Sequence, residues 1–151
     1  MRKVLFSMLA VFLLGALTIS SQQPKPGDNA QARTLEVQIH YTGAGTVDAS
    51  HKIFVALWSS AGDLSGGAPP FAVEGAASKN AVVAFSNVQM SPVFVSAAFD
   101  PTGKWSAQSA PPPGASLGMY SKAPPKPDAV DLAPGKTVRI TLSFDDKVKT
   151  Q

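Results

Sequence analysis

The segment TVRITLSF at residues 137–144 decides the fold class of this chain. Every second residue from Val138 to Phe144 is apolar, and LEVQIHY at residues 35–41 follows the same period of two. Successive side chains of an extended strand point to opposite faces. Each segment therefore predicts a strand with one face in a core and the other toward solvent.

Short apolar segments elsewhere predict further strands. They cover residues 53–58, 71–74, 81–85, 93–99 and 129–132. The almost continuous apolar run at 53–58 is typical of a central strand. A turn at Pro134-Gly135 leads us to expect that the short 129–132 strand pairs with 137–144.

Turn residues separate these strands. Glycines and prolines at 59–70 predict a loop, and Asp100-Pro101-Thr102-Gly103 matches the preferences of a type I turn. Prolines recur through residues 110–128, and because proline lacks a backbone donor, no central strand is expected there.

About seven short strands, short connections and no amphipathic helix outside the first residues predict an all-β domain over residues 34–151. We expect an antiparallel, Greek-key-type β-sandwich, either transthyretin-like or immunoglobulin-like. One core is expected, because a single domain accounts for this length.

The N-terminus predicts export. Residues 1–3 are cationic, and residues 4–19 form an apolar run shorter than the roughly 20 residues that span a bilayer. Small residues at Thr18, Ser20 and Ser21 offer a cleavage site, so we expect a signal peptide at 1–21 and a flexible leader at 22–33. A retained membrane anchor is the alternative. The predicted location is secreted or periplasmic.

Charge and cysteine usage exclude several classes of partner. Loss of Arg2 and Lys3 with the signal lowers the 13 basic residues to 11, against 10 acidic ones, and the cations are scattered. Nucleic-acid binding needs a concentrated basic surface, so we expect no nucleic-acid partner. The chain has no cysteine, which excludes both disulfides and a lipid-modified cysteine, and no membrane association is expected after cleavage.

Four segments carry a family resemblance: FSNV at 85–88, VFVSA at 93–97, DPTG at 100–103 and VDLAPGKTVRITL at 130–142. Together they resemble bacterial carboxypeptidase regulatory-like domains of the transthyretin-like superfamily. The sequence departs from that pattern at Met90-Ser91-Pro92, where a proline-glycine pair is usual, and before Ile53, where no glycine-valine repeat precedes the strand. The resemblance implies a non-catalytic accessory or binding module of an exported protein.

Chemistry-bearing residues do not form a recognisable catalytic or metal motif. His40 and His51 are eleven positions apart, unlike the His-x-His pair of ring-cleaving iron dioxygenases with a related fold, so surface histidines are expected. The chain also lacks the Tyr-Arg-Gly-Ser ending of hydroxyisourate hydrolases and any Gly-x-Ser-x-Gly turn. We expect no catalytic residue, metal or cofactor, and we assign Asp63, Asp100 and Asp145-Asp146 to turns and solvation rather than calcium.

Aromatic residues give the binding hypothesis. Trp105 and Tyr120 flank the proline-rich loop, where exposed rings can stack on sugars or grip a peptide; the alternative is that both pack under their own loop. Trp58 is expected in the core. We predict a non-enzymatic binding or structural module at the cell envelope with a protein or glycan partner. A small carbohydrate-binding domain using Trp105 and Tyr120 and an uncharacterised enzyme are the alternatives, and the proline-rich stretch or an edge strand offers further docking modes.

Overall fold

The computed structural model describes residues 32–151, which form seven strands and one four-residue helix. The expected signal peptide, and residues 22–31 of the expected leader, lie outside the described residues. The elements in chain order are β1 (Thr34–Tyr41), β2 (Ile53–Trp58), α1 (Ala61–Leu64), β3 (Ala72–Ala76), β4 (Val82–Phe85), β5 (Phe94–Phe99), β6 (Ser116–Met119) and β7 (Thr137–Phe144).

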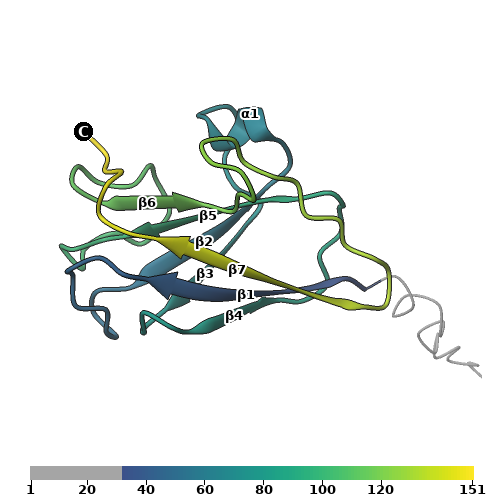
Figure 1. Cartoon of the computed structure of the whole chain (residues 1–151), viewed down its shortest axis with the longest axis horizontal. Helices are drawn as coiled ribbons and strands as arrows, with labels where there is room; N and C mark the ends of the chain where they lie inside the picture. Colours follow the sequence, from purple (N-terminus) through teal and green to yellow (C-terminus); the bar gives the residue numbers. More distant parts are fainter. Residues whose placement is uncertain (1–31) are drawn as a thin grey trace, which may run out of the picture.

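The strands form two sheets. A three-stranded sheet has the order β4-β1-β7, and a four-stranded sheet has the order β3-β2-β5-β6. Figure 1 shows β5 and β6 above β1 and β4. Both sheets contribute to one buried apolar cluster, which gives the domain its β-sandwich character.

Period-two burial is confirmed in both strands that decide the fold class. Leu35, Val37 and Ile39 of β1 are fully buried, and Ile140 and Leu142 of β7 are buried beside them. At the end of β1 the Tyr41 ring joins the two sheets. Its centroid lies 5.1 Å from that of Phe99 in β5 and 4.7 Å from that of Phe144 in β7.

The predicted antiparallel arrangement is wrong for one strand pair. β1 and β7 run parallel, in register from Thr34 opposite Thr137 to Tyr41 opposite Phe144. The other four pairs are antiparallel. Alternating burial is the same for either strand direction, so the sequence pattern did not distinguish them.

The predicted strand at 129–132 is also wrong. Val130 forms a single bridge with Val93, through reciprocal backbone hydrogen bonds of 3.0 and 2.8 Å, and does not pair with β7. The Leu132 amide donates to Ser91 Oγ at 2.8 Å. Val130 and Leu132 are buried, so their apolar character reflects core packing and not membership of a sheet.

Two loop predictions need refinement. The 59–70 loop contains the short helix α1, whose first turn is capped by Ser60 Oγ accepting from the Asp63 amide at 3.1 Å. The proline-rich region contains the unexpected strand β6, at the end of the four-stranded order, so the expectation of no central strand there holds. Gly118 of β6 must lack a side chain, because a Cβ there would lie 2.5 Å from Phe144 Cβ.

Truncation of the β7 core tests the packing of the two sheets. Leu142 is fully buried, so Leu142→Ala is expected to lower the free energy of unfolding by about 3 kcal/mol through lost burial and a cavity. Its neighbour Thr141 faces solvent, so Thr141→Ala is expected to change stability by less than about 0.5 kcal/mol. Urea denaturation followed by circular dichroism compares them, and equal effects would contradict the inward orientation of Leu142.

Candidate functional site

A large open groove lies on the outer face of the four-stranded sheet. Its volume is about 1100 Å³, and its floor includes Phe54, Ala56 and Trp58 of β2. Because Ile53, Val55 and Leu57 point into the core, the alternate residues of β2 must point outward. The strand register continues this floor across the sheet: Ala56 lies opposite Ser96 of β5, and Ser96 lies opposite Met119 of β6.

Trp58 lies on this floor, so its predicted place in the core is wrong. The side chain is half-buried and its Nε1–H donates to Ser96 Oγ at 2.9 Å. The continuous apolar run of β2 predicts that both faces of the strand pack against other parts of the protein. One face meets the core, and the other meets the groove and its surrounding loops.

The walls of the groove are irregular segments. One wall comes from the loop after β2, where Phe71 remains 42% exposed, and another from the segment after β7, where Val148 is 59% exposed. Four prolines also contribute to the lining, namely Pro69, Pro70, Pro111 and Pro124. Prolines restrict the backbone at these four positions, whereas Gly66 and Gly67 of the same lining do not.

The structure separates the two aromatic residues predicted to bind a ligand. Trp105 lines the groove, half-buried, with its ring edge-on to Phe54 at a centroid distance of 5.0 Å. Its Nε1–H donates to the Ser109 carbonyl at 3.1 Å. Tyr120 packs against the core, and its backbone amide donates to the Val95 carbonyl at 2.8 Å. Only Trp105 is part of the groove lining.

A smaller polar pocket of about 430 Å³ adjoins the groove at Phe54 and Trp105. Ser50 and Lys52 line it from the segment that enters β2, and Asp100 and Ser106 line it from the loop that follows β5. The pocket thus lies where two loops meet at one end of the sheet.

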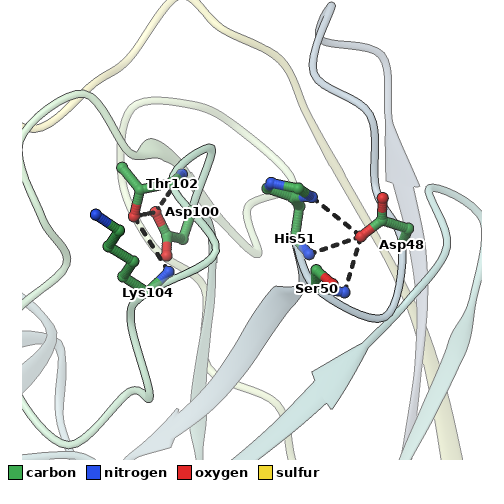
Figure 2. A network of polar contacts seen from close by, with 6 residues as sticks. All are labelled: Asp48, Ser50, His51, Asp100, Thr102 and Lys104. Atoms are coloured by element: carbon green, nitrogen blue, oxygen red, sulfur yellow. Dashed lines mark hydrogen bonds and ion pairs between the residues drawn. The ribbon is translucent and has the colours of Figure 1, made fainter.

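Each of these loops is organised by an aspartate, as Figure 2 shows. Asp48 Oδ1 accepts from the amides of Ser50 and His51, both at 2.8 Å. Asp100 accepts from the Thr102 amide at 2.8 Å and the Thr102 hydroxyl at 2.7 Å, and its other oxygen accepts from the Trp105 amide at 2.8 Å. The turn predicted at Asp100 is therefore present, and it positions the backbone of Trp105.

Hydrogen bonding governs the ionisation of these carboxyl groups. Burial raises the pKa of Asp100, but the bonds from Thr102 and Trp105 outweigh it and leave the pKa below its ordinary value. Backbone donation from His51 and Ser50 lowers the pKa of Asp48. Both groups are therefore ionised at neutral pH, and their oxygens are engaged with the loops they shape.

The histidines have separate partners. His40 is exposed, with Nδ1 3.0 Å from Asn80 Oδ1, and His51 Nδ1 lies 3.1 Å from Asp48 Oδ1. Neither lines the groove or the polar pocket. Within residues 32–151 no group of three histidine, aspartate or glutamate residues is arranged to hold a metal ion.

Asp146 anchors the segment that forms one wall of the groove. It accepts from the Tyr41 hydroxyl, from Ser116 Oγ at 2.7 Å and from the Ala44 amide at 2.8 Å. These donors lower the pKa of Asp146 to about 2. The following residues then pair with β6, where the Leu117 amide donates to the Val148 carbonyl at 2.8 Å. Beyond paired aspartates after a strand, no feature of the sequence indicates this anchor.

Comparison with known proteins adds no relative: no protein-family model, curated protein or solved structure matches this chain. In the part of the chain that the structure covers, residues 32–151, no helix is long and apolar enough to cross a membrane. The groove and its adjoining pocket are therefore the features of this chain that bear on its function.

Replacement of the anchor is expected to produce a pH-dependent loss of stability. Asp146→Asn should lower the free energy of unfolding by about 1–2 kcal/mol at neutral pH, because it removes charge-assisted hydrogen bonds at a partly exposed site. The folded-state pKa of about 2 lies below the ordinary value of 3.8. The contribution is therefore complete above pH 3.8 and is lost as the pH falls toward 2.

Urea denaturation of the wild type and Asp146→Asn across this pH range measures the effect. The difference in stability should be full at neutral pH and shrink progressively toward pH 2. Asp131 is exposed, so Asp131→Asn is a matched control and should match the wild type at neutral pH. A difference for Asp146→Asn that is constant over the whole range would contradict the role of its charge.

Proposed function

We propose that this protein is an exported, non-enzymatic binding module of the cell envelope, secreted or periplasmic, and that its groove takes an apolar segment of a partner protein. The observation that carries the proposal is the apolar floor of the groove, formed by Phe54, Ala56 and Trp58 on the outer face of a sheet. Extended apolar surface that is left accessible commonly marks an interaction site.

The outer face of the other sheet supports this reading by contrast. There the outward residues of β1 are Glu36, Gln38 and His40, and those of β7 include Arg139 and Thr141. Arg139 and Glu36 form an ion pair across the two strands. β1 and β7 thus present polar side chains to water, and only β4 adds apolar ones there, with Val82 57% exposed, whereas the outer face of β2 presents apolar side chains that gain from being covered.

The type of the sandwich is part of the same proposal. We infer a Greek-key, transthyretin-like domain of the carboxypeptidase regulatory-like kind from the four resembling segments quoted above. Seven strands in sheets of three and four agree with such a module. Since domains of that kind are accessory parts of exported proteins, the resemblance and the groove support the same role, although fold alone does not select a ligand.

A glycan is the second candidate, because Trp105 lies between the apolar groove and the polar pocket. An aromatic ring beside hydroxyl groups is a suitable surface for a sugar. The protein partner is favoured because both indole N–H groups are engaged, that of Trp58 with Ser96 and that of Trp105 with Ser109. The rings thus present apolar surface without a free donor for sugar hydroxyls.

A charge on the groove floor should abolish binding of an apolar peptide. The only two tryptophans of the chain, Trp58 and Trp105, both line the groove, so intrinsic fluorescence reports its occupancy. We expect a peptide rich in leucine, phenylalanine and valine to shift the emission of the wild type. Ala56→Lys should weaken this binding by about tenfold or more, because the ligand must then desolvate an ammonium group.

The matched control is Ala84→Lys, which adds the same charge to an exposed position of β4 on the other sheet and should leave binding unchanged. Circular dichroism confirms that both variants are folded, and Trp105→Ala provides a second disruption of the groove. Loss of binding in both lysine variants would show that the site lies elsewhere. A response to soluble polysaccharide but not to the peptide, abolished in Trp105→Ala, would replace the protein partner by a glycan.

A further inference from the structure

We infer that the groove selects partner segments in which apolar residues are flanked by an acidic side chain, held by Lys52 in the polar pocket. This inference rests on the proposed function and names the chemistry of the partner. It is carried by the continuity of the two cavities and by the unused hydrogen-bond donors of the smaller one.

The groove and the pocket share two residues. Phe54 and Trp105 line both, and their edge-on contact forms the boundary between an apolar and a polar surface. A chain that leaves the groove past these rings therefore meets polar groups at once. A ligand that matches both surfaces must change from apolar to polar at this point.

Lys52 lies beside Phe54 on the same outer face. A Cβ built on Gly75 of β3 would lie 3.5 Å from both Lys52 Cδ and Phe54 Cε1, so the aliphatic stem and the ring share the space above this glycine. Lys52 is exposed, and within residues 32–151 its ammonium group takes part in no ion pair. Such a side chain can cover apolar surface with its stem while its charge remains available.

Two hydroxyl groups complete the anion-binding character of the pocket. Ser50 and Ser106 line it, and in the described part of the chain neither hydroxyl donates to another group. The Asp100 carboxylate that lines the same pocket carries a negative charge, but it is only 1% exposed and accepts hydrogen bonds from Thr102 and Trp105, whereas the Lys52 side chain is exposed. A cation and two hydroxyl donors are the groups that a carboxylate accepts from.

The size of the pocket is sufficient for an acidic side chain. Its volume of about 430 Å³ holds a whole side chain and not only a carboxylate. The contact between Lys52 and this carboxylate is exposed, so its contribution is modest. Exposed ion pairs contribute little free energy, so we expect this contact to increase the affinity for the partner by about two- to fivefold.

Two peptides that differ only in charge test this inference. Both carry the same leucine- and phenylalanine-rich centre; one has glutamate at each end and the other glutamine, so either chain direction brings an end to the pocket. The wild-type protein should bind the glutamate peptide about two- to fivefold more tightly, measured by tryptophan fluorescence. The preference should shrink as sodium chloride is added, because salt screens exposed charges.

Lys52→Met should remove the preference, since it keeps the stem and deletes the ammonium group, and Lys52→Arg should retain it. Lys104→Met removes the same net charge from an exposed lysine that does not line the pocket, and should leave the preference intact. Equal binding of both peptides by the wild type, or a preference that persists in Lys52→Met, would overturn the inference and leave the proposed function standing. Failure of both peptides to bind would overturn the two together.

Discussion

The parallel, in-register pairing of β1 with β7 orients the apolar core of both sheets. Eight residues of each strand face one another, and β1 is the central strand of its sheet. A slip of one residue would turn every apolar side chain of a strand toward water. The register also brings Tyr41 opposite Phe144, so that the Tyr41 ring contacts Phe99 of the second sheet. One pairing therefore fixes both the core of the three-stranded sheet and its contact with the four-stranded one.

The groove follows from this core. Successive side chains of a strand point to opposite faces. Because Val55 and Leu57 of β2 point into the core, Ala56 and Trp58 lie on its outer face. Two carboxylates then position what surrounds that face: Asp100 holds the loop that carries Trp105, and Asp146 holds the segment that carries Val148. Asp100 accepts from donors of its own loop, whereas Asp146 ties its segment to Tyr41, Ala44 and Ser116 elsewhere in the fold. The candidate site is thus built by the fold and by loop hydrogen bonds, and not by a catalytic or metal motif.

Much of the fold could be predicted from the sequence, because alternation of apolar and polar residues records burial. The strands expected at 35–41 and 137–144 agree with β1 and β7 to within a residue, and β2 occupies the range expected from its apolar run. Alternation does not depend on strand direction, so the sequence does not predict that β1 and β7 run parallel. Val130 shows the converse error, since burial in a connecting segment has the same local appearance as a short strand.

The candidate site could be predicted only in part. Trp105 was identified from its place beside a proline-rich loop, and it lines the groove. Tyr120 has a similar sequence setting but packs against the core, a difference that depends on contacts distant in sequence. A continuous apolar run does not show which face of a strand meets the second sheet, so the sequence places Trp58 in the core although it lies on the groove floor. No feature of the sequence distinguishes Lys52 from the other lysines, because its place in the polar pocket depends on how two loops meet.

If the outer face of the four-stranded sheet is the binding surface, the indole resonances of Trp58 and Trp105 must respond to a bound ligand. In a ¹H–¹⁵N correlation spectrum of the processed protein titrated with an apolar peptide, the Nε1–H signals of Trp58 and Trp105 should both shift with one dissociation constant. Amide signals of Glu36, Gln38 and Thr141 on the opposite sheet should stay in place. Shifts confined to that opposite face, with both indole signals unmoved, would place the binding surface on the three-stranded sheet instead.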